Sequence, residues 1–416
     1  MMDYYLIGKN VEDSYSKIIH NEFNNNQYEL VSVNKEEVIK IFEKKLFKGI
    51  NITKPYKELA LTYVDELDEL AKRINAINIV VNKNGKLIGY NSDYLGLKYL
   101  LTKNNIDLTN KNVAILGTGG SAKMIYTLAS DLKANNIIYV SRNKCDEHII
   151  SYDDLYNHDV DILFNATPVG QRPLENKKVL VDLTKLKKLE VVIDLNYNPF
   201  NTRVMQKANE LNIKSINGLD MLIEQARISE ELFFEKEIST TINEEVKKKI
   251  NSKKNIVLIG MPYAGKSEIG KNLAKMLNRP LIDVDEIIES SLNKSVEDII
   301  NENGVETFRK LERNIIKKCG GLTGTIISTG GGVITNKKNM EILKSNGIIF
   351  AINRKKELIT FDNSRPLCQN SKAFDILYQK RKNLYAKYKD YEISNNETLL
   401  DASKEIISIY EKDISD

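Results

Sequence analysis

The sequence has few of the residues on which disulfide frameworks and metal centres depend. Its three cysteines, Cys145, Cys319 and Cys368, lie far apart, are odd in number and form no C-x-x-C pair. This pattern argues against a disulfide framework and against a zinc knuckle, and it fits a reducing cytoplasm. The chain also has only three histidines, so we expect acid–base chemistry to fall on other residue types.

Long apolar runs and long blocks of like charge are also missing. No apolar run reaches membrane-spanning length, and no basic segment precedes an apolar core at the start, so we expect a soluble protein without a secretory leader. There are 61 basic and 57 acidic residues, and the one block of like charge that stands out is residues 247–249. This balance argues against nucleic acid as the main partner and favours small molecules.

The chain is long enough and apolar enough for two or three domains, with 416 residues of which 42% are hydrophobic. Residues 256–259 predict a buried strand, and residues 260–267 fit G-x-x-x-x-G-K-[ST]. In such a loop, backbone N–H groups between Gly260 and Gly265 wrap nucleotide phosphates. Lys266 reaches the β and γ phosphates, and the Ser267 hydroxyl binds Mg²⁺. We therefore expect an ATP site here.

A second glycine loop lies earlier in the chain. Gly117, Gly119 and Gly120 belong to a G-x-G-x-x-A pattern that follows an apolar strand and precedes a helical stretch. This arrangement places a dinucleotide pyrophosphate at a helix N-terminus. The next strand is followed by Arg142 rather than by an acid. Because an arginine there can take a 2′-phosphate, NADP is favoured over NAD.

Four polar clusters come before this loop, at residues 14–16, 49–57, 75–81 and 89–96. In an extended segment, the hydroxyls of Ser14 and Ser16 would point the same way. Pro55 suits the first turn of a helix, which would place Lys57 early on that helix. Asp93 is placed to cap the helix that follows it, and this does not exclude a chemical role.

These clusters and the glycine loop, followed by N-A-T-P-x-G at residues 165–170 and G-x-x-M-L-x-x-Q-A at 218–226, resemble shikimate dehydrogenase over residues 1–250. The resemblance implies a two-lobed α/β fold. Residues 1–100, completed by 219–250, would form the catalytic lobe, and 101–218 a Rossmann-type NADP-binding lobe. Lys57 and Asp93 would be the catalytic pair. The substrate would be bound by Ser14, Ser16, Thr53, Asn78, Ser92 and Gln225, and NADP(H) by Gly117, Gly119, Gly120, Arg142 and Gly218.

The chemistry of the implied pair agrees with the residue types. Hydride transfer from NADPH to a ring ketone builds negative charge on oxygen, which the Lys57 ammonium stabilises and to which it can relay a proton. Asp93 would orient the lysine, and which of the two moves the proton stays open. The sequence departs from the family at Asp13, Lys17 and Ile79, where histidine, proline and threonine are usual. These departures concern affinity more than reaction type.

The later part of the chain carries further motifs beyond a linker at residues 251–253. Asp283 and Asp285 alternate at the end of a predicted strand, so one can address Mg²⁺ and the other an acceptor hydroxyl. Three glycines at 330–332 follow another strand and let a backbone approach a ligand closely. Arg309 lies on a predicted helix in F-R-x-x-E, and Arg381 lies on another in R-x-x-L-Y.

In this order, these motifs resemble shikimate kinase over residues 254–416, and imply a P-loop α/β/α domain of the NMP-kinase type. The departures are Glu268, where threonine is usual, Val305, where glutamate is usual, and a short lid between Ile352 and Arg365. An acid beside the phosphate loop is unfavourable for anion binding. By the resemblance, the catalytic residues would be Lys266, Asp285 and Arg365; Ser267 and Asp283 would serve Mg²⁺, Gly260 and Gly265 the nucleotide, and Arg309, Gly331 and Arg381 the substrate carboxylate.

Together the two halves predict a bifunctional enzyme. It would reduce 3-dehydroshikimate to shikimate with NADPH and then phosphorylate the 3-hydroxyl with MgATP. Three alternatives remain at this point: a dehydrogenase with a weakened kinase half that binds or regulates, a dehydrogenase for quinate or with NAD, and a P-loop kinase for another polyol. Oligomeric state and domain orientation stay open.

Overall fold

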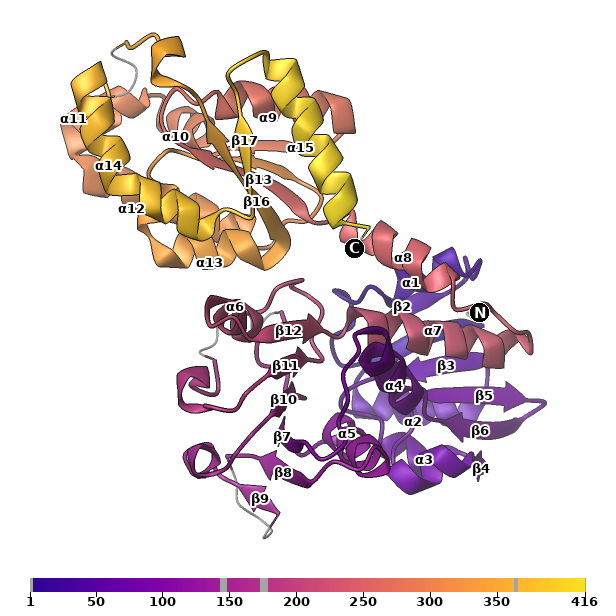
Figure 1. Ribbon diagram of the computed structural model, residues 1–416. Coiled ribbons are helices and arrows are strands. Elements are labelled where there is room, and N and C mark those ends of the chain that lie inside the picture. The colour runs from indigo at the N-terminus through magenta and orange to yellow at the C-terminus, as the bar shows by residue number, and fades with distance from the viewer. Residues whose placement is uncertain (1–2, 143–147, 173–178, 363–365, 416) are drawn as a thin grey trace. The chain divides into compact units, whose positions relative to one another are not determined.

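The chain folds as two compact units, Met1–Lys247 and Lys248–Asp416, and each is built on parallel or mostly parallel sheets (Figure 1). The computed structural model describes residues 3–142, 148–172, 179–362 and 366–415. Cys145 and Arg365 lie outside these ranges. The division between the units falls within α8 (Ile242–Asn251).

The first sheet of the N-terminal unit has the strand order β2-β1-β3-β5-β6-β4. Its β3–β5 and β5–β6 pairs are antiparallel, and the others are parallel. Asn84 and Gly85 both have positive φ and join β5 to β6 in a tight hairpin, the backbone conformation that Asn-Gly pairs favour. The strands are β1 (Tyr4–Gly8), β2 (Glu29–Ser32), β3 (Gly49–Ile52), β4 (Glu66–Leu67), β5 (Ile79–Lys83) and β6 (Lys86–Tyr90).

Helices cover this sheet and bring late residues back to it. Phe233 of α7 packs into the same core as Tyr4 and Tyr28, so α7 belongs structurally with the first lobe. The short 3₁₀ helix η1 (Leu59–Tyr63) begins after Lys57. Lys57 therefore lies in the turn that precedes a helix, and the prediction that it lies on one is wrong. The helices are α1 (Ser16–Glu22), α2 (Lys35–Lys44), α3 (Glu69–Ile74), α4 (Asp93–Lys103) and α7 (Leu219–Phe234).

The second sheet is entirely parallel, with the order β12-β11-β10-β7-β8-β9. The chain winds one way from β7 to β9 and the other way from β7 to β12. The carboxyl end of β7 is thus the switch point at which such sheets bind nucleotides, and α5 (Gly120–Asp131) begins there. The predicted Rossmann-type lobe is confirmed. The other elements are β7 (Asn112–Leu116), β8 (Asn136–Val140), β9 (Ile149–Ile150), β10 (Ile162–Asn165), β11 (Val191–Asp194), β12 (Lys214–Asn217), α6 (Arg203–Glu210), η2 (Asp154–Asn157) and η3 (Leu183–Lys185).

The C-terminal unit is a five-stranded parallel sheet, β14-β15-β13-β16-β17, with helices on both faces (Figure 1). Along β13, Ile256 and Leu258 face a core with α9 and α15, whereas Val257 and Ile259 face a core with α10 to α14. The predicted three-layer P-loop fold is confirmed. Its strands are β13 (Asn255–Gly260), β14 (Leu281–Asp283), β15 (Ile326–Ser328), β16 (Gly347–Asn353) and β17 (Tyr391–Ser394). Its helices are α9 (Lys266–Leu277), α10 (Val284–Leu292), α11 (Val296–Asn303), α12 (Val305–Cys319), α13 (Lys337–Asn346), α14 (Ser371–Tyr388) and α15 (Leu399–Asp413), with η4 (Val333–Thr335) and η5 (Lys356–Leu358).

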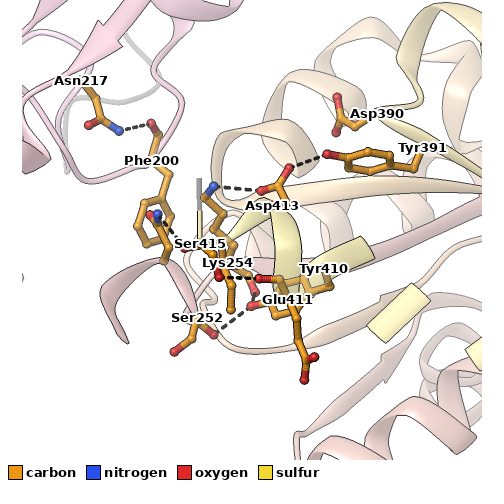
Figure 2. A network of polar contacts seen from close by, with 12 residues as sticks. Phe200, Asn217, Ser252, Lys254, Asp390, Tyr391, Tyr410, Glu411, Asp413 and Ser415 are labelled. Carbon is orange, nitrogen blue, oxygen red and sulfur yellow. Dashed lines mark hydrogen bonds and ion pairs between the residues drawn. The ribbon is translucent and has the colours of Figure 1, made fainter. Parts of the chain in front are cut away.

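The start of this unit is tied to its own last helix (Figure 2). The Tyr410 hydroxyl lies 2.9 and 3.0 Å from the carbonyl oxygens of Ser252 and Lys254. Lys254 Nζ donates to Asp413 at 3.1 Å, and the Tyr391 hydroxyl donates to the same carboxylate at 2.9 Å. The backbone that leads into β13 is therefore held by α15 before the phosphate loop begins. Among the described residues, no helix has both the length and the apolar character that crossing a membrane requires.

Candidate functional sites

The N-terminal unit has a cleft of about 540 Å³ between the loops of its two lobes. Most of the residues predicted for the dehydrogenase substrate meet in it. Ser92 is the exception because it does not line the cleft. Those that do are Ser14, Ser16, Thr53, Lys57, Asn78, Asp93 and Gln225, together with Gly218 from the predicted nucleotide set.

Lys57 and Asp93 form a close ion pair in this cleft. Lys57 Nζ donates to Asp93 Oδ2 at 2.5 Å, and the two side chains are 14% and 3% exposed. Asp93 Oδ1 accepts from Asn78 Nδ2 at 3.1 Å, and the same nitrogen donates to Ser92 Oγ at 3.0 Å. Ser92 therefore supports Asn78 from behind. The carboxylate holds one cation and one amide in fixed positions.

The cap of α4 is formed differently from the prediction. Asp93 is the first residue of the helix, and no side-chain cap bond is made by its N-cap residue, Ser92. The first backbone N–H groups, those of Asp93 and Tyr94, instead donate to Asn91 Oδ1 at 3.0 and 3.4 Å. The capping role predicted for Asp93 is wrong. The Asp93 carboxylate pairs with Lys57 instead.

The two serines converge although their segment is not extended. Ser16 begins α1, and its Oγ lies 2.9 Å from Ser14 Oγ. Ser14 Oγ also lies 3.2 Å from the Tyr197 hydroxyl, which comes from the loop between β11 and α6. The sequence interpretation missed Tyr197. Its position after a predicted strand end was the available signal, because ligands bind at the carboxyl ends of parallel strands.

The glycine loop after β7 fits a dinucleotide. Gly117 has φ +106°, and a Cβ on Gly119 would meet no atom within 4 Å. The N-terminus of α5 has no side-chain cap, so its N–H groups and the open space over Gly119 fit a pyrophosphate. Arg142 is exposed just beyond β8. Gly218 has a packing reason as well, since a Cβ there would lie 2.2 Å from Leu195 O.

A buried carboxylate supports the next loop of the nucleotide lobe. Asp194 is fully buried and accepts from Thr202 Oγ1 at 2.6 Å, Asn165 Nδ2 at 2.9 Å and Asn196 Nδ2 at 2.8 Å. Burial raises the pKa of Asp194 to about 6, against the lowering by these hydrogen bonds. Asn165 Nδ2 also donates to Val169 O at 3.0 Å. Asp194 thus fixes Asn165, the first residue of the N-A-T-P-x-G segment, and through it Val169.

The C-terminal unit has a pocket of about 490 Å³ over the phosphate loop. Its lining includes most of the residues predicted for nucleotide and acceptor, but not Gly260 or Asp283. The prediction for Arg365 falls outside the described residues. The predicted residues that line the pocket are Gly265, Lys266, Ser267, Asp285, Arg309, Gly331 and Arg381.

The phosphate loop is shaped by close backbone approaches. Gly260 has φ +151°, and a Cβ there would lie 2.4 Å from Ile352 O; Gly265 has φ +91°. Lys266 Nζ donates to Gly260 O at 3.1 Å and to Met261 O at 2.9 Å, so the buried lysine lies across its own loop. The uncapped start of α9 offers N–H groups in the way that phosphate binding requires.

Asp283 and Asp285 have different surroundings. The reason is not the alternation of side chains along a strand that we expected, because Asp285 already belongs to helix α10. Asp283 ends β14 and caps α10, accepting from the N–H groups of Asp285 and Glu286 at 3.1 and 3.2 Å. Asp285 lies in the first turn of α10 and lines the pocket. Asp283 Oδ2 is buried and has no hydrogen-bond partner among the described residues, which fits a role near a Mg²⁺ ion. Carboxylates near Mg²⁺ in nucleotide sites act with phosphates rather than as a closed cage, and no group of three or more metal-binding side chains occurs in the described ranges.

The glycine triplet makes room for charged side chains. A Cβ on Gly332 would lie 1.9 Å from Arg309 Nη2, and one on Gly330 would lie 2.7 Å from Asp285 Oδ1. Arg309 Nη1 donates to Glu312 at 2.7 Å, and the Glu312 side chain is only 1% exposed. Burial raises the pKa of Glu312, which Arg309 opposes. The carboxylate thereby fixes one guanidinium at the pocket wall.

Arg381 lies deeper in the same wall. It is buried, and this burial lowers the pKa of its guanidinium. One turn later the Tyr385 hydroxyl donates to Gly331 O at 2.6 Å. The sequence motifs contained Glu312 and Tyr385, but we assigned neither a role. Both hold a predicted substrate-binding residue in place.

Glu268 and the lid segment have local partners. Glu268 is exposed, and Lys271 Nζ lies 3.1 Å from it and 3.2 Å from Glu286. The repulsion expected beside the phosphate loop is therefore offset by a neighbouring ammonium. In the lid, Arg354 lines the pocket, and the carbonyl oxygen of Asp362 accepts from the Tyr263 hydroxyl at 2.8 Å.

Comparison with known proteins assigns both units to families. The family model of the shikimate dehydrogenase substrate binding domain matches residues 6–80, and that of shikimate kinase matches residues 262–411. A curated shikimate dehydrogenase (NADP(+)) from Clostridium botulinum strain Loch Maree is 39% identical over 238 residues, 53% of this chain and 92% of that protein. One from Methanococcus maripaludis strain C6 is 34% identical over 274 residues, 60% of this chain and 96% of that protein. The crystal structure of shikimate dehydrogenase 1 from Peptoclostridium difficile aligns with a TM-score of 0.57 at 31% identity, over 60% of this chain and 98% of that chain. The chain therefore belongs to the shikimate dehydrogenase family, and a shikimate kinase domain follows the dehydrogenase part in the sequence.

Proposed function

We propose that the N-terminal unit reduces 3-dehydroshikimate to shikimate with NADPH and that the C-terminal unit phosphorylates the shikimate 3-hydroxyl with MgATP. One observation carries this proposal. The chain contains two sites whose families catalyse successive reactions, and in each site the charged residues predicted from the sequence lie together. The product of the first reaction is the substrate of the second. A kinase half that only binds or regulates is not favoured, because its pocket retains the phosphate loop, Asp285 and two arginines.

In the cleft, Lys57 and Asp93 would act on the ring ketone. Bound NADPH supplies the hydride. The Lys57 ammonium stabilises the negative charge that develops on the ketone oxygen and can give it a proton. Asp93 keeps the ammonium in place and accepts from a substrate hydroxyl, and Asn78 holds the second oxygen of Asp93.

The remaining residues of the cleft would bind and orient the substrate. The converging hydroxyls of Ser14, Ser16 and Tyr197 offer donors for its carboxylate. Thr53 and Gln225 also line the cleft and supply further polar groups for the ring hydroxyls. Arg142 and the glycine loop would hold the 2′-phosphate and pyrophosphate of NADP(H).

In the kinase pocket, the loop and its lysine would hold the nucleotide. Bound MgATP supplies the phosphoryl group. Lys266 and the N–H groups of the loop neutralise phosphate charge, with Ser267 as a metal ligand and Asp283 behind it. Asp285 accepts the proton of the acceptor hydroxyl. Arg309 and Arg381 bind the substrate carboxylate, for which a planar guanidinium is suited. Arg365 would close over the phosphates.

The wider setting follows from these activities. We propose small-molecule substrates, no nucleic-acid or membrane partner, and a cytoplasmic location. Residues 1–100 with 219–250 would serve as the catalytic lobe, 101–218 as the NADP lobe, 251–253 as the linker and 254–416 as the kinase.

Separate assays of the two reactions test the proposal. We expect NADPH oxidation with 3-dehydroshikimate, and ADP release with shikimate and ATP. Quinate in the reverse direction, NADH, and other polyols serve as comparison substrates. Activity with quinate but not shikimate, or with NADH but not NADPH, would overturn the dehydrogenase assignment. ATP turnover that does not depend on shikimate would overturn the kinase assignment.

A further inference from the structure

A buried polar pair, His20 and Glu230, lies at the wall of the dehydrogenase cleft, and the proposed reaction does not use it. His20 of α1 is 2% exposed, and its Nδ1 is within hydrogen-bond distance of Oε1 of Glu230, which is fully buried on α7. Asn25 Nδ2 donates to the same oxygen at 2.9 Å. Because a carboxylate only accepts, Nδ1 carries the hydrogen. Glu230 Oε2 is buried and has no partner among the described residues.

The imidazole is fixed on its face as well as at its edge. Its ring stacks on Tyr28 with centroids 3.6 Å apart and planes 8° apart. The Tyr28 hydroxyl donates to Asn51 Oδ1 at 2.6 Å, and Asn51 Nδ2 donates to Ser229 Oγ at 2.8 Å. Ser229 Oγ then donates to the carbonyl oxygen of Gln225 at 2.8 Å. Two routes thus join α1 to α7: the hydrogen bond from His20 to Glu230, and the ring stack on Tyr28 followed by hydrogen bonds through Asn51 and Ser229.

Both helices that these routes join reach the cleft. Ser16 begins α1, Gln225 lies on α7, and both line the cleft together with His20 and Asn51. Asn25 and Glu230 do not line it. The substrate-binding groups on the two helices are about 200 residues apart in sequence and come from different directions, so their separation depends on what holds α1 against α7.

Stability alone is a poor reason for such a pair. Burying a carboxylate costs free energy that its hydrogen bonds only offset, and apolar side chains of similar size often stabilise as well or better. Burial also lowers the pKa of His20, although Glu230 opposes the shift. The pair is therefore a neutral imidazole that donates to an acid, a directional bond that sets a position.

We infer that His20 and Glu230 are positioning residues for the dehydrogenase substrate. They hold the first turn of α1, with Ser16 and the preceding Ser14, in register with Gln225 on α7, so that the carboxylate and the ring hydroxyls of one cyclic hydroxy acid are bound together. This inference rests on the proposed reduction of 3-dehydroshikimate, and neither residue touches the reacting atoms.

Steady-state reduction by three His20 variants of the full chain tests it. His20→Phe keeps a flat ring on Tyr28 but loses the donor, and we expect the KM for 3-dehydroshikimate to rise about ten-fold, the loss of roughly one charge-assisted hydrogen bond. The KM for NADPH should stay within about two-fold. His20→Asn places a donor near the position of Nδ1 and should recover most of the substrate affinity. His20→Gln places its donor farther out and should not.

Asn25→Ala is the matched control. It removes a donor to the same Glu230 oxygen outside the cleft, so it should lower the denaturation midpoint without raising the KM for 3-dehydroshikimate. Rescue by His20→Gln but not by His20→Asn would overturn the inference, because it would indicate direct contact through Nε2. An equal rise in KM for Asn25→Ala, or an unchanged KM in folded His20→Phe and Glu230→Gln, would also overturn it. Failure of the proposed function is distinguishable, because the wild-type chain would then not reduce 3-dehydroshikimate.

Discussion

The two sites of this chain achieve their geometry by different means. In the dehydrogenase cleft, side chains hold side chains: Asp93 fixes Lys57 at 2.5 Å, Asn78 fixes Asp93, and Ser92 supports Asn78. In the kinase pocket, the backbone comes first. Gly260 and Gly265 have positive φ, and the space over Gly332 is taken by Arg309.

This difference predicts different responses to substitution. Where a polar network positions the reacting groups, truncation of one side chain releases the others, and effects within the network should not be additive. Where glycine backbone sets the shape, the addition of a single methyl group should displace a functional side chain without removing it. Substitutions of both kinds can test the contrast within one chain.

The largest effect is expected for Lys266→Ala. The variant loses the ammonium that donates to the carbonyl oxygens of Gly260 and Met261 and that would neutralise phosphate charge, and phosphorylation should fall by ~10² to 10³ or more. Reduction of 3-dehydroshikimate should stay near wild type, since the two sites lie in different units. Lys275→Ala, an exposed lysine on the same helix, is the control and should leave kinase turnover unchanged. Phosphorylation retained by Lys266→Ala would contradict the assigned role.

Lys57→Ala should have the opposite selectivity. Loss of the ammonium leaves a buried Asp93 carboxylate without its cation, and reduction should fall by ~10² to 10³ while phosphorylation is unchanged. Lys54→Ala removes another lysine that lines the cleft but has no ion pair with Asp93, and it should cost much less. Equal losses of both activities in Lys57→Ala would show that the units are coupled.

The buried Asp194 should make the stability of the nucleotide lobe depend on pH. Its pKa rises from 3.8 to about 6 on folding, so the folded state binds the proton more tightly than the unfolded state. Stability should therefore be lost as pH rises from about 4 to about 6 and remain lower above that range, by at most ~3 kcal/mol. Denaturation of wild type and Asp194→Asn across this range measures the difference. A pH slope that is the same in both would contradict the prediction.

The smallest effect is expected for Gly332→Ala. The new Cβ would lie 1.9 Å from Arg309 Nη2, and Glu312 prevents the guanidinium from moving freely. We expect the KM for shikimate to rise about ten-fold with little change in the KM for ATP, since one charged contact is misplaced. Arg309→Lys in the Gly332→Ala background is informative: a restored KM would confirm the steric cause, and an unchanged KM in Gly332→Ala alone would exclude it.

Local motifs were predictable because short stretches of backbone define them. The phosphate loop at 260–267 and the glycine loop at 117–120 each need only a strand, a turn and a helix in succession, and both occur where expected. Predictions that depended on a helix boundary were less secure. Pro55 suggested a helix that would contain Lys57, but the structure begins a 3₁₀ helix at Leu59.

Supporting residues were harder to find because their partners are distant in sequence. Tyr197 reaches Ser14 across 183 residues, and His20 reaches Glu230 across 210. Glu312 was visible as part of a motif, but its role became apparent only from its burial beside Arg309. No spacing rule connects such positions, since the contact exists only after the sheets and helices have packed.

The sequence by itself determined the two nucleotide loops, the order of the two units and the residue types available for chemistry, because these follow from contiguous patterns of glycine, apolar and charged residues. Only the tertiary structure decided that Asn91 rather than Asp93 caps α4, that Asp283 caps α10, and that Tyr197 and Glu230 come to lie beside Ser14 and His20. These outcomes depend on which side chains burial brings together, and burial is a property of the packed molecule.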